Sequence, residues 1–297
     1  MIRYQQCPSC GSEKIQKEIT VKDHSVSGEE FEIWRCSNCH LFFTQHIPNE
    51  SEIGKYYRSE NYISHSDTRK GIVNKLYHLI REYTLGQKKN LLQKSCGLQR
   101  GSLLDIGSGT GSFLTTMQKA GWEITGIEPD KIARKNSEEL HHIKPLEPAA
   151  IKDLPSSSFD AITMWHVMEH VHQLQNQFKE LNRLIKPEGR VFIAVPNHTS
   201  GDADHYRDYW AAWDVPRHLY HFSPESMRFL AGKFGFTIEN YKPMWFDSFY
   251  VSMLSEKYKS GKSHLLSALI SGIKSNLKAM KNVEHCSSVI HILEKVR

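Results

Sequence analysis

Short apolar runs separated by segments with helical patterning are the clearest feature of the middle of the chain. The apolar positions at 102–106 and the run RVFIAVPN at 190–197 are typical of buried strands, and EITGIEPD at 123–130 predicts another. Between the strands at 102–106 and 123–130, the segment SFLTTMQKAG predicts a helix that follows a glycine-rich turn. Strands that alternate with helices in this way favour an α/β fold.

The pattern continues into the last third of the chain. SPESMRFLAGKFGF at 223–236 predicts a helix with Ser223 as its N-cap and Gly235 at its end. FTIENYKP at 236–243 and SSVIHILEKV at 287–296 predict two further strands. We expect a helical insert between these strands, at residues 249–281.

Composition and charge exclude several classes of protein but do not indicate an activity. Of the 297 residues, 39% are hydrophobic and 24% are charged, which is typical of a folded protein rather than a disordered one. The formal net charge is +5 and no dense basic run occurs, so nothing argues for binding to DNA. The start lacks the apolar segment of a secretory signal, and no apolar run is long enough to span a membrane. We therefore expect a cytoplasmic protein.

Four of the six cysteines form two C-x-x-C pairs near the start of the chain, Cys7 with Cys10 and Cys36 with Cys39. Two such pairs can supply the four thiolates of a tetrahedral zinc ion, and the residues between them are enough for a β-hairpin. A redox C-x-x-C is expected to stand alone rather than in a matched set. The spacing predicts a structural Zn²⁺ ion in a small zinc ribbon.

A glycine-rich turn follows the strand at 102–106. Gly107, Gly109 and Gly111 allow the backbone to approach a ligand closely, next to the amino end of a helix. Asp105 precedes the turn, where a carboxylate would repel a pyrophosphate but would suit a ligand with an amino group and a positive sulfonium. Glu128 ends the second strand, a position that suits an acid bonded to ribose hydroxyls.

LLDIGSGTGSFL followed by GIEPD resembles the S-adenosylmethionine site of class I methyltransferases. The likeness continues through LPSSSFDAITMWHVMEHV and RVFIAVPN, and it implies a seven-stranded Rossmann-like sheet with helices on both faces. It also implies that S-adenosylmethionine contacts ten residues, with Asp153 and Leu154 near the adenine. These predicted cofactor-binding residues are Asp105, Gly107, Ser108, Gly109, Gly111, Glu128, Pro129, Asp153, Leu154 and Trp165.

The segment MWHVMEHVH at 164–172 contains three residues of types that often take part in catalysis, His166, Glu169 and His170. The string H-x-x-E-H also occurs in inverted zinc proteases, but the surrounding segments do not support that class. A second interpretation is a divalent-ion site like the E-x-x-E-H stretch of ubiquinone-type O-methyltransferases, with His166 in place of the first acid. In a third, His166 is the general base that takes a proton from the acceptor.

An aromatic stretch, HYRDYWAAWDVPRHLYHF, lies within the segment 197–222 that precedes the predicted helix at 223. A connection of this length is often a lid over an active site. We expect Trp210 and Trp213 to form one packed face and the end nearest residues 217–221 to face the acceptor. The predicted substrate-binding residues are His170, Arg217, His218, Tyr220 and His221.

The sequence thus predicts a zinc ribbon at 1–48, a linker and helical extension at 49–100 and a methyltransferase domain at 101–297. We expect methyl transfer to a small-molecule acceptor such as a sugar or quinol. The alternatives are an RNA base methyltransferase, which the acidic balance of the zinc ribbon disfavours, and a non-catalytic S-adenosylmethionine-binding scaffold. The oligomeric state is left open.

Overall fold

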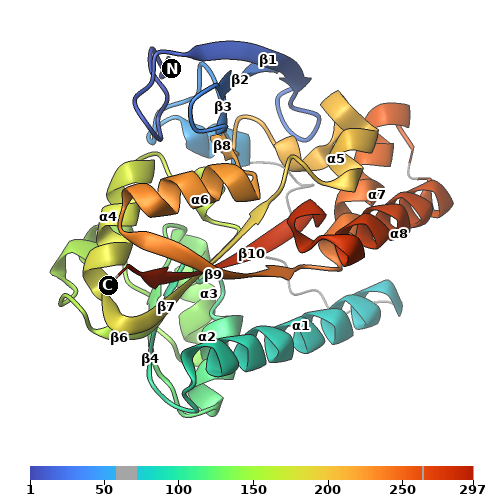
Figure 1. Ribbon diagram of the computed structural model, residues 1–297. Coiled ribbons are helices and arrows are strands. Elements are labelled where there is room, and N and C mark those ends of the chain that lie inside the picture. The colour runs from blue at the N-terminus through green and yellow to red at the C-terminus, as the bar shows by residue number, and fades with distance from the viewer. Residues whose placement is uncertain (58–71, 263, 297) are drawn as a thin grey trace. The chain divides into compact units, whose positions relative to one another are not determined.

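A computed structural model describes residues 1–57, 72–262 and 264–296 (Figure 1). The chain divides into two compact units, which are treated separately here. The first unit contains Met1–Tyr62, His166–Phe178 and Ile193–Leu293. The second contains Ile63–Trp165, Lys179–Phe192 and Glu294–Arg297. The zinc-ribbon segment therefore belongs to the same unit as most of the C-terminal half of the chain.

The second unit is built from parallel strands and the helices between them. Strand β4 (Ser102–Ile106) pairs in parallel with β5 (Glu123–Ile127) and with β6 (Phe159–Trp165). Helix α2 (Ser112–Lys119) connects β4 to β5, and α3 (Lys131–His141) follows β5. The long helix α1 (Ile72–Cys96) precedes β4 and lies within the segment 49–100 predicted as a linker and helical extension.

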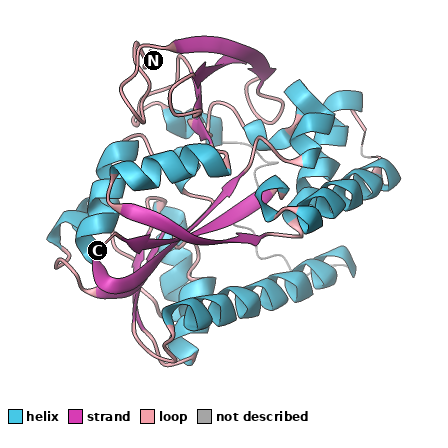
Figure 2. Cartoon of the chain, in the orientation of Figure 1, coloured by secondary structure: helices cyan, strands magenta, loops and turns pink. Residues whose placement is uncertain are grey.

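The larger sheet has the strand order β5-β4-β6-β7-β10-β9. Figure 2 shows the strands in magenta and the helices in cyan. Here β7 is Ile185–Pro196, β9 is Phe236–Pro243 and β10 is Ser288–Lys295. Helix α4 (Leu174–Leu184) leads into β7. The strands predicted at 236–243 and 287–296 are both present, and the predicted α/β fold class is confirmed.

The strand count differs from the seven that the resemblance implied. The described part of the chain has six strands in this sheet, and the position expected for a third strand holds only a single parallel bridge between Ile127 and Leu146. Pro145 and Pro148 flank Leu146, and proline lacks the N–H that a strand needs for its ladder. The segment continues as the short 3₁₀ helix Pro148–Asp153.

The first unit begins with a small antiparallel sheet. The predicted hairpin is present as β1 (Ile15–Lys22) and β2 (Glu30–Cys36). Strand β3 (Phe42–Thr44) extends the sheet and pairs with β8 (Tyr220–His221) from the far end of the aromatic stretch. The ladder between β3 and β8 joins two segments that are distant in the sequence.

The segment 197–222 is mostly buried structure rather than an open lid. It contains helix α5 (Gly201–Tyr206), the 3₁₀ turns Arg207–Tyr209 and Ala211–Trp213, and strand β8. Trp210 and Trp213 meet edge to face with ring centroids 5.2 Å apart, and they pack in one core with Phe31 and Ile33 of the hairpin. The packed face predicted for the two tryptophans is therefore confirmed.

The remaining helices of the first unit follow the predicted pattern. Helix α6 (Pro224–Lys233) is capped by Ser223, and Gly235 follows it with a positive φ of 77°. The predicted insert contains α7 (Asp247–Ser260) and α8 (Leu265–Lys281). Single 3₁₀ turns occur at Ile53–Tyr57, Met168–His170 and Val283–His285. Among the helices described, none combines the length and apolar character needed to cross a membrane.

Candidate active site

The turn after β4 has the backbone of a close-approach loop. Gly107, Gly109 and Gly111 all have positive φ angles, of 74°, 54° and 81°, which side-chain-bearing residues rarely adopt. Open space surrounds the position that a Cβ of Gly109 would take, whereas a Cβ on Gly111 would collide with the Ser137 side chain. The turn thus leaves open space next to Gly109, whereas at Gly111 it packs closely against α3.

Asp105 is a buried carboxylate at the base of this turn, with 2% of its surface exposed. The Thr163 hydroxyl on β6 donates a 2.6 Å hydrogen bond to its Oδ1. Burial raises the pKa of Asp105 to about 7, because desolvation outweighs the Thr163 hydrogen bond and the charge of Lys88. The site therefore holds an acid that is ready to ionise when a cation arrives.

Glu128, at the end of β5, organises the same turn. Its Oε2 accepts a 2.7 Å hydrogen bond from the amide of Gly109, and its Oε1 accepts one of 2.8 Å from the amide of Asp130. Pro129 lies between these partners, and its carbonyl accepts a hydrogen bond from Arg134. Asp105, the glycine turn and Glu128 are thus brought together, as the sequence predicts.

Trp165 and Ser108 add aromatic and polar surface to this region. Trp165 at the end of β6 meets Phe113 edge to face at 5.5 Å, and the Lys88 ammonium lies 4.2 Å from the centre of its ring. The Ser108 hydroxyl and the indole N–H of Trp165 are buried, and neither has a hydrogen-bond partner among the described residues. Buried donors without partners are uncommon in folded proteins, so they are available to a ligand.

Asp153 and Leu154 lie at the end of the 3₁₀ helix Pro148–Asp153. Asp153 is exposed, and the Leu154 carbonyl accepts a 2.6 Å hydrogen bond from Arg183. No contact described in the structure joins either residue to the Asp105–Glu128 group. Their predicted role at the adenine stays a prediction.

His166, the first residue after β6, lies between two carboxylates of the first unit. Its Nε2 is 3.0 Å from Oδ2 of Asp247, and its Nδ1 is 3.3 Å from Oε1 of Glu169. Its backbone has a positive φ of 56°, and its amide bonds the carbonyl of Ala194 in β7. No sequence signal indicates Asp247, because it lies two residues before the predicted insert at 249–281 and belongs to no motif.

The two carboxylates change the expected protonation of His166. Burial alone lowers its pKa, but the close contacts with Asp247 and Glu169 and the negative charges of these carboxylates outweigh burial and raise the pKa to about 10. At neutral pH the ring is an imidazolium inside a group that carries two negative charges and one positive charge.

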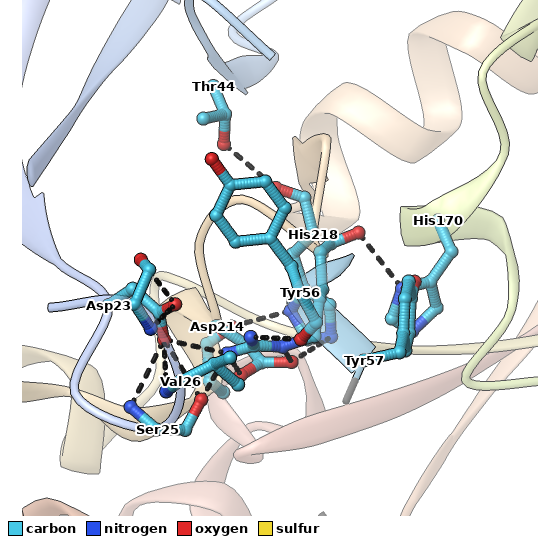
Figure 3. A network of polar contacts seen from close by, with 12 residues as sticks. Asp23, Ser25, Val26, Thr44, Tyr56, Tyr57, His170, Asp214 and His218 are labelled. Atoms are coloured by element: carbon cyan, nitrogen blue, oxygen red, sulfur yellow. Dashed lines mark hydrogen bonds and ion pairs between the residues drawn. The ribbon is translucent and has the colours of Figure 1, made fainter. Parts of the chain in front are cut away.

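Four of the five predicted substrate residues are buried, namely Arg217, His218, Tyr220 and His221, and His170 is half-buried. Figure 3 shows His170 and His218 within one network of polar contacts. The Arg217 guanidinium bonds Asp214 at 2.6 Å and Asp23 at 3.1 Å, and its Nη1 donates to the carbonyl of Tyr56. Hydrogen bonds from Ser27, followed by the charge of Arg217, hold the pKa of Asp23 at about 2 despite its burial. These contacts give Arg217 a full set of structural partners.

Tyr220 and His221 belong to β8 and hold the small sheet against its neighbours. The Tyr220 hydroxyl donates to the carbonyl of His172 at 3.1 Å and contacts the Tyr4 hydroxyl at 3.2 Å. His221 Nε2 lies 3.0 Å from the Thr44 hydroxyl. His170 and His218 meet with ring centroids 4.7 Å apart. The structure brings His170 and His218 together, while their role toward an acceptor stays a prediction.

Comparison with known proteins gives the family. Residues 77–241 match a family model described as "Methyltransferase domain", and the match covers more than half of the 297 residues. The chain belongs to the methyltransferase domain family. The resemblance to class I S-adenosylmethionine-dependent methyltransferases is thereby confirmed at the level of the family.

Curated relatives of this methyltransferase include ubiquinone biosynthesis O-methyltransferases. The protein of that name from Actinobacillus pleuropneumoniae serotype 7 (strain AP76) is 33% identical over 118 residues, which are 36% of this chain and 50% of the relative. That from Rickettsia prowazekii (strain Madrid E) is 25% identical over 160 residues, 51% of this chain and 61% of the relative. The chain spans about half the length of the curated relatives it matches.

Solved structures support the fold of the methyltransferase. A candidate sarcosine dimethylglycine methyltransferase from Galdieria sulphuraria superposes with a TM-score of 0.51 at 15% identity. The alignment covers 75% of this chain and 88% of that protein. A likeness at this level of identity concerns the fold alone.

The second unit of the methyltransferase fits the cofactor of its family. S-adenosylmethionine carries an ammonium group, a sulfonium and ribose hydroxyls. The site offers a buried carboxylate at Asp105, a second one at Glu128, an open glycine backbone and unpartnered donors at Ser108 and Trp165. The donor set suits a cationic ligand, because two carboxylates in one site would repel a phosphate.

The four cysteines of the two C-x-x-C pairs converge in the first unit. Their Sγ atoms all lie within 4.8 Å of one another, with Cys7 and Cys39 3.4 Å apart and Cys10 and Cys36 3.6 Å apart. All four are free thiols, and three of them are buried. Zinc–sulfur bonds of about 2.3 Å in a tetrahedron place sulfur atoms about 3.8 Å apart, so the cluster fits a zinc ion.

Proposed function

We propose that this chain transfers a methyl group from S-adenosylmethionine to a hydroxyl or carbon of a small-molecule acceptor such as a sugar or quinol. The family and the names of its curated relatives support methyl transfer. Because the chain spans only about half of those relatives, the acceptor is part of the proposal.

One observation carries the cofactor half of the proposal, namely the buried carboxylate of Asp105 beside a turn of three glycines with positive φ. Asp105 would hold the ammonium group and favour the neighbouring sulfonium by charge. Glu128 would bond the ribose hydroxyls, and the amides of the turn would lie along the cofactor. Bound S-adenosylmethionine supplies an electrophilic methyl group, so the residues around it need only align the acceptor and exclude water.

His166 is the proposed catalytic residue, now as part of a group with Asp247 and Glu169. An imidazolium cannot accept a proton, but the group as a whole carries net negative charge and can receive one. Asp247, whose side chain is 23% exposed, would take the proton from the acceptor, and the His166 imidazolium would hold that carboxylate in place. In this arrangement a histidine with a raised pKa can still assist removal of the proton from the acceptor.

The proposed role of the zinc ribbon is structural and does not include docking of a substrate. A four-thiolate ion has no open coordination position, so it would hold the hairpin in shape without taking part in chemistry. Two of the cations of the hairpin are already paired, Lys17 with Glu32 at 2.8 Å and Arg35 with Glu18 at 3.4 Å. Paired cations offer little to an RNA backbone, which favours the small-molecule acceptor.

Calorimetric titration of S-adenosylmethionine into the protein tests the cofactor site. We expect micromolar binding, and Asp105→Asn and Glu128→Gln should each weaken it at least tenfold. Glu138→Gln on the exposed face of α3 is the matched control and should bind normally. If the wild type fails to bind the cofactor, the proposed function is wrong.

Consumption of the cofactor with candidate acceptors tests turnover. We expect S-adenosylhomocysteine to accumulate with a sugar or quinol acceptor and not with RNA. Cofactor binding without turnover on any acceptor would favour the scaffold alternative, whereas turnover on RNA would favour the RNA methyltransferase.

A further inference from the structure

We propose that Glu169, His170 and His218 form a binding site for one divalent transition-metal ion, distinct from the cysteine cluster. Their ligand atoms all lie within 4.8 Å of one another, and all three residues belong to the first unit. Two imidazole nitrogens and a carboxylate are a common donor set for zinc and ferrous ions. The proposal does not depend on the proposed function.

The carboxylate of Glu169 lacks the partners that a buried acid normally has. Only 1% of its surface is exposed, and neither oxygen accepts a hydrogen bond within the described part of the chain. Its nearest cation, His166, lies at 3.3 Å without hydrogen-bond geometry. A buried carboxylate without hydrogen bonds is costly, so an ion at this position would supply its missing partner.

The two histidines are held as metal-ligating histidines usually are. His170 places Nδ1 2.9 Å from the carbonyl of Arg217, and His218 places Nδ1 2.8 Å from the carbonyl of Ala212. A carbonyl can only accept, so each Nδ1 carries the proton and each Nε2 keeps its lone pair. Histidine ligands commonly donate their second nitrogen to a carbonyl in this way, which fixes the ring and its tautomer.

The two chain segments that carry these ligands are tied together by the backbone. Glu169 and His170 belong to the short 3₁₀ helix Met168–His170, and His218 precedes β8. The amide of Leu219 donates a 2.8 Å hydrogen bond to the carbonyl of Glu169. Tyr57 adds its hydroxyl 3.1 Å from Nδ1 of His170, and these residues lie at the edge of the network in Figure 3. The site is therefore built before any ion arrives.

The ligand types and the neighbouring charges favour a single divalent transition-metal ion at this site. Asp214 lies 3.9 Å from Nε2 of His218, and its own charge is balanced by Arg217. Both ring nitrogens of His166 face carboxylates, Nδ1 toward Glu169 and Nε2 toward Asp247, so this histidine is not among the proposed ligands. Magnesium and calcium prefer oxygen ligands, so a site with two nitrogens selects zinc, ferrous or cobaltous ions.

This donor set differs from the one that the E-x-x-E-H resemblance suggests. That stretch would use positions 166, 169 and 170, all from one segment. The structure assigns the third ligand to His218, which lies in the aromatic segment instead. Three protein ligands leave a coordination position open for water or a substrate oxygen, unlike the closed cysteine cluster.

Cobalt titration of zinc-loaded protein tests the site. We expect one Co²⁺ ion to bind per chain in addition to zinc, with weak visible bands and without the charge-transfer absorption that thiolate ligands produce. Glu169→Gln and His218→Gln should each weaken cobalt binding at least tenfold. His205→Gln, which changes an exposed histidine on α5, is the matched control and should bind cobalt normally.

Thermal unfolding gives a second readout, because an ion that binds only the folded state raises the midpoint. Cobalt should raise the midpoint of the wild type and of His205→Gln but not that of Glu169→Gln or His218→Gln. The proposal is overturned if zinc-loaded wild type binds no further cobalt, if the bound cobalt has thiolate absorption, or if neither substitution weakens binding.

Discussion

The imidazole of His166 lies 3.0 Å from the carboxylate of Asp247, although one residue follows β6 and the other begins α7. His166 also has a positive φ of 56°, a conformation that costs energy for a residue other than glycine. The ion pairs to Asp247 and Glu169 offset that strain. The insert that carries α7 is therefore tied directly to the segment proposed for catalysis.

This pairing predicts a pH-dependent contribution to stability. Because the pKa of His166 is raised to about 10 in the folded protein, its protonated form stabilises the fold fully below the unfolded value of 6.5. That contribution should decline between pH 6.5 and about 10. Wild type should exceed Asp247→Asn in free energy of unfolding by about 1–3 kcal/mol at pH 6, since the ring is 34% exposed and partly screened.

Urea unfolding of both proteins at pH 6 and pH 10 measures the difference. The advantage of wild type should shrink at pH 10. Asp204→Asn removes an exposed partner of Lys278 on the surface and should show no such pH dependence. An advantage that is equal at both pH values would mean that His166 is not protonated in the folded protein.

Ionised Asp105 is expected to lower the stability of the protein while it favours binding of the cofactor. The pKa of Asp105 is raised to about 7 by burial, so the free energy of unfolding of the ligand-free protein should fall as pH rises from about 4, the unfolded pKa, to about 7. Asp105→Asn should raise the free energy of unfolding of the ligand-free protein by about 1–3 kcal/mol at pH 8, where the native acid must ionise in a buried site. The same substitution should weaken S-adenosylmethionine binding.

Calorimetry across pH 6 to 8 separates these effects. Affinity of the wild type for the cofactor should rise with pH, because only ionised Asp105 attracts the ammonium group, while Asp105→Asn should bind weakly at every pH. Thr163→Val removes the hydroxyl that bonds Asp105 and should shift the pH dependence upward without abolishing binding. Equal affinity of wild type at pH 6 and pH 8 would argue against this role of Asp105.

Local sequence signals accounted for the features that depend on neighbouring residues. The glycine turn, the Ser223 cap and the paired cysteines each follow from short-range geometry, and the structure has all three in the predicted form. The acid at position 128 was recognised because it ends a strand in a known arrangement, and its carboxylate bonds the Gly109 amide as a partner of that turn.

Features that depend on long-range packing were not accessible in this way. Leu146 has the apolar character of a strand residue, but the flanking prolines reduce the expected third strand to one bridge. Asp247 meets His166 only because α7 folds back to it, and nothing in the neighbourhood of Asp247 indicates this. Tertiary contacts between distant segments leave little trace in a single sequence.

The cysteine cluster predicts a loss of metal and of stability together. Cys36→Ser removes one thiolate from a site in which Cys36 is fully buried, so the protein should lose one zinc ion per chain. The free energy of unfolding should fall by about 3 kcal/mol or more, because zinc binding at such sites contributes directly to folding. Cys96→Ser, at a half-buried thiol outside the cluster, should retain zinc. Metal analysis combined with thermal unfolding measures both quantities, and unchanged zinc content in Cys36→Ser would contradict the assignment.

Arg217 distinguishes a structural role from the predicted contact with the acceptor. Its side chain is 1% exposed and that of Asp23 is 0% exposed, so replacing the arginine leaves a buried carboxylate without its counter-charge. Arg217→Gln should lower the free energy of unfolding by about 3–5 kcal/mol. Arg228→Gln breaks a pair in which the arginine is 53% exposed and should cost less than about 1 kcal/mol. Urea unfolding measures both changes in the free energy of unfolding. Kinetic measurements with an identified acceptor test the alternative, in which Arg217 contacts the acceptor. If Arg217→Gln raises KM for the acceptor while stability is unchanged, the residue binds substrate, because a buried counter-ion cannot be removed without a cost in folding energy.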